Sequence, residues 1–98
     1  MSAYTVHIAY LSFECFIGHS QSLKDKRRVT KSLKDRLRNR FNVSVAEIAY
    51  MEEWQRSGIG VTMVGNDRRY LESQMGAIRQ LLEEQTGFEL LNVQMEWV

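Results

Sequence analysis

Apolar residues along the chain recur at two periods, and these periods predict the elements of the fold. From Tyr4 to Ile17 the chain is rich in β-branched and aromatic residues that alternate with polar ones. The apolar positions are first Val6, Ile8 and Tyr10, and then Leu11, Phe13, Cys15 and Ile17. A period of two is typical of a β-strand, and the change of phase near Tyr10 fits either a bulge or burial on both faces.

A helix is predicted after the loop Gly18–Ser22. Ser22 suits an N-cap, and Asp25 lies three residues later in a position like that of a capping box. Apolar residues then follow at steps of four, which gives a helix with one inward face: Val29, Leu33, Leu37 and Phe41. Asn42 is a plausible end of this helix.

The second half of the chain repeats these patterns. Val43–Met51 and Ile59–Gly65 resemble strands joined by the polar loop Glu52–Gly58. Asn66 or Asp67 is predicted to cap a second helix, and Gly87 to end it, around the apolar positions Leu71, Met75, Ile78 and Leu82. Leu91, Val93, Met95 and Trp97 alternate with polar residues and predict a last strand.

The predicted order is therefore β-α-β-β-α-β. Right-handed crossovers on one sheet place both helices on the same face, which is the α+β ferredoxin-like sandwich with an antiparallel four-stranded sheet. A chain of 98 residues is most simply a single domain, residues 1–98.

Charge is distributed unevenly along this pattern. The net charge is +1, but residues 24–40 hold nine Lys or Arg and two Asp, a local charge of +7. Arg27, Lys31, Lys34 and Arg38 fall on the outward side of the first predicted helix, and Lys24 and Arg28 extend the patch. The hypothesis is a face that binds RNA, with contacts from Lys24, Lys26, Arg27, Arg28, Lys31, Lys34 and Arg38. The alternative is an ordinary solvated helix surface.

No pattern in the sequence indicates catalysis or a cofactor. An RNA-recognition motif stacks bases on aromatic residues of its central strands, and Ile59–Asn66 has none. Acylphosphatases need an arginine in a phosphate-binding loop, which the segment Gly18–Ser22 lacks. His7, His19 and Cys15 make neither a zinc site nor a catalytic triad, and Cys15 is expected to be a small buried residue. The interpretation is a non-enzymatic binding protein.

A second hypothesis is a module for protein interaction. Trp54, flanked by charged residues in the predicted hairpin loop, suits either an interface anchor or a residue that folds back on the core. The expected partner interface is Trp54, Gln55 and Arg56, with a homodimer, or an acidic protein, docked through this loop and the sheet. The N-terminus has no signal-peptide pattern, and no apolar stretch is long enough to span a membrane, so the expected location is the cytoplasm.

Three motifs also resemble a known family. "QSLKDKR" (Gln21–Arg27), "FNVSVAEI" (Phe41–Ile48) and "WQR" (Trp54–Arg56) resemble, in order and spacing, the YlxP-like family of small bacterial proteins. That resemblance implies a ferredoxin-like fold and no catalytic residue. Genes of the family often lie beside those of translation initiation and ribosome maturation factors, which implies a role near RNA or the ribosome. Glu52 stands where the family usually has Asp.

Overall fold

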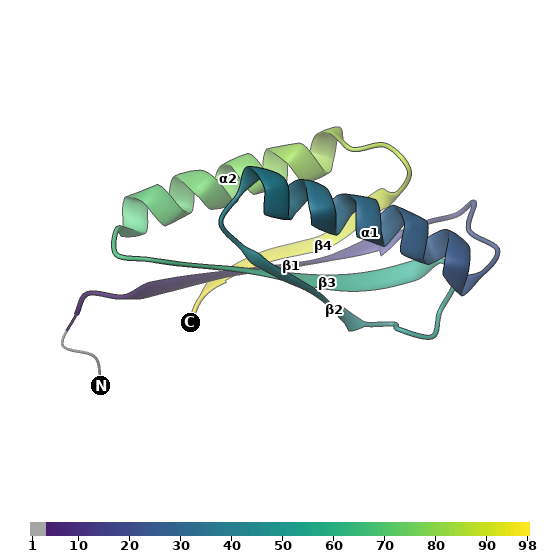
Figure 1. Ribbon diagram of the computed structural model, residues 1–98, viewed down its shortest axis with the longest axis horizontal. Helices are drawn as coiled ribbons and strands as arrows, with labels where there is room; N and C mark the ends of the chain where they lie inside the picture. Colours follow the sequence, from purple (N-terminus) through teal and green to yellow (C-terminus); the bar gives the residue numbers. More distant parts are fainter. Residues whose placement is uncertain (1–3) are drawn as a thin grey trace.

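Six elements follow one another along the chain in the computed structural model, which describes residues 4–98 (Figure 1). They are β1 (His7–Phe16), α1 (Leu23–Arg40), β2 (Ser44–Ala49), β3 (Arg56–Gly65), α2 (Arg68–Glu84) and β4 (Glu89–Trp97). The predicted order β-α-β-β-α-β is confirmed. That one domain spans residues 1–98 stays a prediction, and residues 1–3 lie outside the described part.

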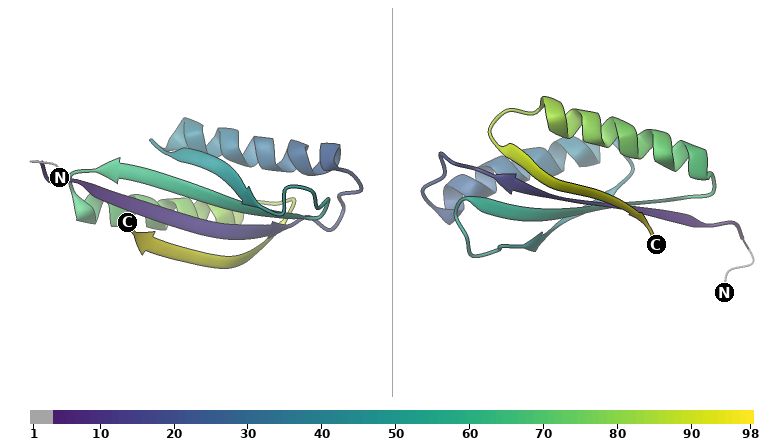
Figure 2. Two further views of the ribbon diagram at one scale, coloured as in Figure 1. Left: turned by 90° about the horizontal axis from the view of Figure 1, so that it is seen from below. Right: turned by 180° about the vertical axis from the view of Figure 1, so that it is seen from behind.

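The four strands form one antiparallel sheet in the order β2-β3-β1-β4. Both helices lie on one face of this sheet, and the opposite face is uncovered (Figure 1; Figure 2, left). The fold is therefore the ferredoxin-like α+β sandwich that the sequence predicts. Its strand order makes β2 the edge strand beneath α1 and β4 the edge strand on the other side.

The core lies between the helices and the sheet, and β1 with the residue that follows it contributes every second residue from Ala9 to Ile17. Ala9, Leu11, Phe13, Cys15 and Ile17 are all buried, and β1 pairs with β3 from His7 to Phe16 without a break in register. There is thus no bulge in β1 on that side. Ile8 and Tyr10 lie on the uncovered face and are partly buried there, which is closer to the second explanation of the phase change, apolar residues on both faces.

The irregularities lie in the edge strands instead. β4 has one extra residue opposite Ser12–Glu14, and Asn92 in this bulge has a φ of 53°. β2 has one extra residue between Glu47 and Ala49, opposite the start of β3. A Cβ atom at Gly58 would lie 2.7 Å from the Cβ of Ala49, so only glycine allows β2 and β3 to approach at this point.

One predicted loop was too long. The segment Glu52–Gly58 was expected to be a loop, but Arg56, Ser57 and Gly58 belong to β3. Gly58 reads as a loop residue in the sequence, whereas in the structure it is required by the close contact with β2. Asp67, one of the two predicted caps, is the N-cap of α2 and accepts a hydrogen bond from the Tyr70 amide.

Candidate nucleic-acid interface

The N-terminus of α1 is fixed by reciprocal hydrogen bonds. The Ser22 hydroxyl accepts from the Asp25 amide, and the Asp25 carboxylate accepts from the Gln21 amide, both at 3.0 Å. This is close to the predicted capping box, but Asp stands in place of Glu or Gln, and its carboxylate binds the amide of Gln21 instead of that of Ser22. The cap sets where the helix begins, and it therefore sets which side of α1 each basic residue faces.

Most of the predicted contact residues lie on the surface of α1. The predicted residues that are exposed or partly exposed are Lys24, Arg27, Arg28, Lys31, Lys34 and Arg38. They spread over the side of the helix that points away from the sheet. Their arrangement on one face agrees with the helical periodicity of the sequence.

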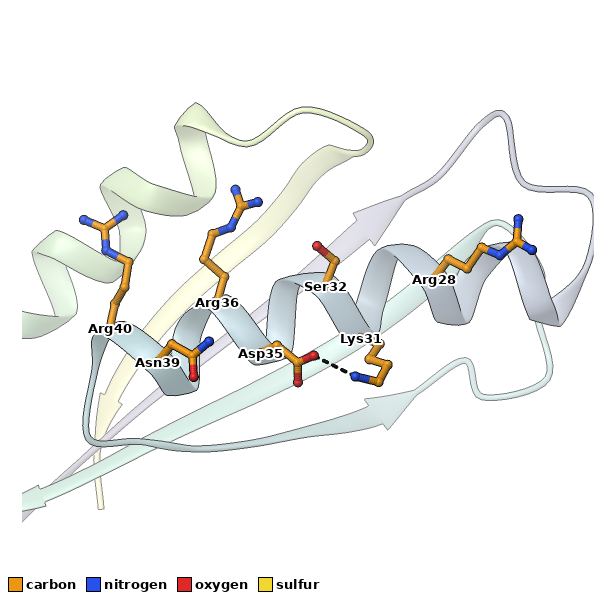
Figure 3. A pocket seen from close by; sticks show the side chains of 7 residues that line it. All are labelled: Arg28, Lys31, Ser32, Asp35, Arg36, Asn39 and Arg40. Atoms are coloured by element: carbon orange, nitrogen blue, oxygen red, sulfur yellow. Dashed lines mark hydrogen bonds and ion pairs between the residues drawn. The ribbon is translucent and has the colours of Figure 1, made fainter.

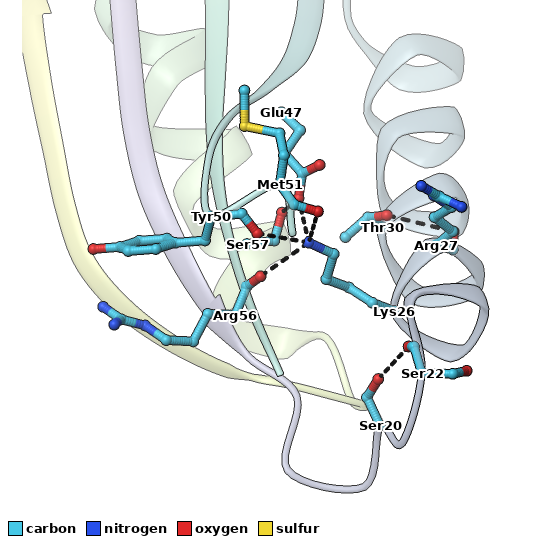
Figure 4. Close-up of polar contacts among 10 residues, drawn as sticks. All are labelled: Ser20, Ser22, Lys26, Arg27, Thr30, Glu47, Tyr50, Met51, Arg56 and Ser57. Atoms are coloured by element: carbon cyan, nitrogen blue, oxygen red, sulfur yellow. Dashed lines mark hydrogen bonds and ion pairs between the residues drawn. The ribbon is translucent and has the colours of Figure 1, made fainter. Parts of the chain in front are cut away.

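Lys26 is the exception, and its assignment as a surface contact was wrong. Its side chain is only 1% exposed. The ammonium group donates to three backbone carbonyls, those of Tyr50 at 2.9 Å and of Met51 and Arg56 at 3.2 Å (Figure 4). It also lies 3.0 Å from the Glu47 carboxylate. Every hydrogen of the ammonium group is thus directed at a group of the protein, and none is left for a ligand.

The position of Lys26 follows from the same helical period that places the other basic residues outside. Lys26 precedes Val29 by three residues and Leu33 by seven, so it lies on the inward side of α1. A buried ammonium group is tolerated only where it is paired and fully hydrogen-bonded. Glu47 is held in turn by the Ser57 hydroxyl, which donates to its carboxylate at 2.5 Å.

Two outward basic residues already have partners in the protein. Lys31 lies 2.7 Å from the Asp35 carboxylate one turn later, and this hydrogen bond lowers the pKa of Asp35 below its ordinary value. Arg38 donates to the Val45 carbonyl of the edge strand β2 at 2.8 Å. The side of α1 with Arg27, Lys31, Lys34 and Arg38 therefore borders β2. We call it the sheet-edge flank.

A second row of basic residues was missed in the sequence. Arg28, Ser32, Arg36 and Arg40 follow one another at steps of four, so they form one row along the helix. The side chains of Arg36 and Arg40 extend toward α2 and the loop before β4, whereas that of Arg28 extends along α1 toward its N-terminus (Figure 3). We call this side of α1 the groove flank. The step of four is visible in the sequence, but of this row only Arg28 was among the predicted contact residues.

A shallow hollow of about 570 Å³ runs along this row. Arg28, Arg36 and Arg40 line it together with neighbouring polar residues of α1 (Figure 3). None of these three arginines forms an ion pair with a residue of the described chain, 4–98, and Arg36 donates to the Gln85 side chain at 2.6 Å. Their charge is therefore not neutralised within the fold.

The loop between β2 and β3 is held tightly at its base and is exposed at its tip. The Gln55 amide group donates to the carbonyls of Gly18 at 3.0 Å and Ser20 at 3.3 Å, and the Gln55 carbonyl accepts from the Ile17 amide. Trp54 at the tip is 55% exposed. Of the two explanations offered for this residue, the structure excludes folding back on the core.

Arg56 and Gln55, two of the three predicted interface residues, make side-chain contacts with other parts of the chain. The Arg56 guanidinium lies 2.8 Å from the Glu14 carboxylate and stacks 3.9 Å above the centre of the Tyr50 ring. Glu14 also accepts a hydrogen bond from Asn92, and the bonds from Asn92 and Arg56 together hold its pKa below the ordinary value. Gln55 is nevertheless exposed and the Arg56 side chain is 42% exposed, so the expected interface of Trp54, Gln55 and Arg56 stays a prediction.

The structure also bears on the thiol of Cys15, on metal binding and on membrane insertion. Cys15 is buried, and burial raises the pKa of its thiol to about 12. Within residues 4–98 no three His, Cys, Asp or Glu side chains come together in a way that could hold a metal ion. Neither helix of the described chain is long and apolar enough to cross a membrane.

Sequence comparison places this fold in a family. Residues 8–95 match the model of DUF503, a family described as proteins of unknown function. The chain belongs to this family. It is also 33% identical over 90 residues to the protein of Bacillus subtilis (strain 168) that is described as uncharacterized protein YlxP. The alignment covers 92% of this chain and 98% of that protein, which confirms the resemblance to YlxP-like bacterial proteins.

The three motifs that carry the resemblance meet in one place in this DUF503 member. Lys26 comes from the first motif, Glu47 from the second, and Arg56, whose carbonyl binds Lys26, from the third. Figure 4 shows these residues converging at the end of the sheet near the start of α1. In this chain, the shared motifs therefore build the junction between α1 and the β2–β3 loop.

Proposed function

We propose that this protein is a non-enzymatic cytoplasmic protein that binds structured RNA, such as ribosomal RNA, through α1. The observation that carries the proposal is the surface of α1. Eight of its nine basic side chains are exposed or partly exposed, and Asp35, one of only two acidic residues of the helix, is paired with Lys31. Such a concentration of positive charge attracts a polyanion.

The rest of the molecule supports a directional contact. Basic residues outside α1 number four, against ten acidic residues. In α2, Arg68 and Arg79 lie near Glu72 and Glu83 at helix spacing, so their charges are partly compensated. A polyanion would therefore approach the α1 side and be repelled by the acidic remainder. The relationship to YlxP names no partner and adds no weight to this choice.

Charge reversal on matched helices tests the proposal. One variant carries Lys24→Glu, Arg28→Glu and Lys31→Glu in α1, and the control carries Arg68→Glu, Arg69→Glu and Arg79→Glu in α2. Both change the net charge by the same amount. We expect the α1 variant to lose about tenfold or more of its affinity for a structured RNA, with a reduced salt dependence, and the α2 control to lose much less.

The measurement is fluorescence anisotropy at several salt concentrations, with circular dichroism to verify folding. If the wild-type protein binds no RNA, or if the two variants lose affinity equally, the proposal is wrong.

A specific observation favours a second candidate, self-association through the uncovered sheet face and the Trp54 loop. Val64 and Ile48 lie on that side and are 61% and 48% exposed, and Met51 beside the loop is 51% exposed. Glu52 and Glu53 directly precede Trp54. Their negative charge suits an acidic partner poorly, which leaves the homodimer as the better form of this hypothesis. Analytical ultracentrifugation tests it: we expect a concentration-dependent dimer that Trp54→Ala weakens.

A further inference from the structure

The groove flank of α1 connects three hollows: the middle one lies on the surface of α1 alone, and the hollow at each end lies between α1 and either α2 or the loop that follows α2. They adjoin one another along α1 as one longer depression, with volumes of about 330, 570 and 330 Å³. The first shares Arg28 and Arg36 with the second, and the second shares Arg40 with the third. From Arg28 to Arg40 the depression follows about 18 Å of helix, at 1.5 Å per residue.

The two walls of this depression differ in chemistry. The α1 wall carries the arginine row Arg28, Arg36 and Arg40, none of which is in an ion pair within the described chain. At the two ends of the depression, the opposite wall carries uncharged amides from α2 and the loop that follows it, Gln74, Gln80 and Gln85. One wall can therefore neutralise phosphates, while the other offers both hydrogen-bond donors and acceptors.

Half-buried aromatic rings lie at both ends of the depression. Phe88 lines the hollow near Arg28, and Phe41 lines the hollow near Arg40. Two carboxylates line the depression: Asp35 is paired with Lys31, and Glu84 accepts a hydrogen bond from Gln80 at 3.1 Å but keeps its negative charge. Within residues 4–98 neither carboxylate forms an ion pair with an arginine of the row.

From these features we infer that the depression along α1 binds a single-stranded segment of RNA. The arginine row contacts consecutive phosphates, the glutamine wall contacts base edges, and bases stack at Phe88 and Phe41. A basic groove combined with aromatic surfaces is the usual arrangement for single strands, whereas a duplex has its bases stacked inside. The inference rests on the proposed function and names the form of RNA that this part of the surface takes.

The basic residues of α1 outside the groove flank provide a matched comparison within the same helix. One variant removes three charges from the groove flank, with Arg28→Gln, Arg36→Gln and Arg40→Gln. The other removes three charges elsewhere on α1, with Lys24→Gln, Arg27→Gln and Lys34→Gln. The probes are a short oligouridylate, an RNA duplex of the same length, and polyglutamate as an acidic polypeptide.

The expected result is a reversal of preference between the two variants. The groove variant loses more affinity for oligouridylate than for duplex, and the slope of log K against log salt for oligouridylate falls by about two, at roughly 0.7 per phosphate contact. The variant with Lys24→Gln, Arg27→Gln and Lys34→Gln loses more affinity for the duplex than for oligouridylate. Phe88→Leu, which keeps an apolar side chain against the core, weakens oligouridylate binding about tenfold through lost stacking. Thermal unfolding of each variant verifies the fold.

Four outcomes overturn the inference, and the first two leave the proposed function intact. Binding of duplex but not of oligouridylate, or equal losses in the two triple variants, excludes the single strand in the groove and leaves RNA binding by α1 intact. Binding of polyglutamate as tight as that of oligouridylate replaces RNA with an acidic polypeptide. Absence of binding to every RNA probe removes the proposed function and the inference together.

Discussion

Lys26 and Lys31 lie five residues apart in α1, and each is paired with a carboxylate, but their surroundings are opposite. The Lys31–Asp35 pair is the shorter of the two, at 2.7 Å against 3.0 Å for Lys26–Glu47. The Lys31 side chain is 77% exposed, and that of Lys26 is 1% exposed. Because water screens the first pair and is excluded from the second, burial rather than distance decides how much each matters to the fold.

The difference shows that basic residues have two roles in α1: some form an exposed charged surface, and Lys26 forms a buried junction. The outward charges of α1 are free to meet a polyanion, whereas the inward charge joins the helix to the β2–β3 loop. A buried lysine is a costly way to make such a junction, because its ammonium group loses its hydration. The cost is offset here by three carbonyls and one carboxylate, all directed at the same nitrogen.

The largest expected effect comes from removing the buried charge. Lys26→Met keeps most of the aliphatic volume but leaves Glu47 and the three carbonyls without their donor. We expect the free energy of unfolding to fall by about 3 kcal/mol, at the lower end for a broken buried pair because Glu47 is 22% exposed. Urea denaturation measures it.

The matched control is Lys24→Met, the same chemical change at an exposed position of the same helix. It is expected to change the free energy of unfolding by less than about 0.5 kcal/mol. Equal effects at the two positions would contradict the distinction between the inward and outward sides of α1.

The sequence predicts much of this arrangement, because the fold depends on periodicity that is visible in the chain. The β-α-β-β-α-β order, the cap at Ser22 and the outward face of α1 all follow from apolar spacing and local hydrogen-bonding residues. Periodicity also places Lys26 inward. What it cannot supply is the partners, since Glu47, Tyr50, Met51 and Arg56 reach Lys26 only after β2 and β3 have paired.

The groove flank of α1 shows the same limit. Arg28, Arg36 and Arg40 form a row that the sequence contains, but the glutamines opposite them come from α2 and its following loop. Whether such a row faces water or another wall depends on tertiary packing, which no local pattern encodes. In the same way, Gln55 and Arg56 look available in the sequence and are held by Gly18, Ser20 and Glu14 in the structure.

A smaller loss is expected when the carboxylate partner of Lys26 is changed. Glu47→Gln preserves the shape of the side chain and can still bond to Ser57, and Lys26 retains its three carbonyls. We expect a decrease of about 2 kcal/mol in the free energy of unfolding, which is typical for loss of a hydrogen bond to a charged group. A decrease as large as that of Lys26→Met would mean that the carboxylate, and not the carbonyls, is the main support of the lysine.

The ion pair of Glu14 with Arg56 is intermediate in exposure between the Lys26–Glu47 and Lys31–Asp35 pairs, with side chains that are 18% and 42% exposed. Hydrogen bonds from Asn92 and Arg56 lower the pKa of Glu14, so its contribution to stability is complete above the ordinary value of 4.5 and is lost as pH falls through the lower, folded value. Glu14→Gln should therefore flatten the decline of stability below pH 4.5. Urea denaturation at a series of acidic pH values measures the free energy of unfolding. If it falls with pH as steeply in the variant as in the wild type, the prediction is wrong.

The smallest effect is expected at the exposed pair. The pKa of Asp35 is lowered by its hydrogen bond with Lys31, and this should be visible as a lowered midpoint when its carboxyl carbon is titrated by NMR. Because both groups are exposed, Lys31→Met should return the midpoint toward its ordinary value without a resolvable change in the free energy of unfolding. High salt should shift the midpoint in the same direction, since the interaction is screened by ions. A shift that persists in high salt would mean that the outward side of α1 is less hydrated than its exposure indicates, and its contrast with Lys26 would be reduced.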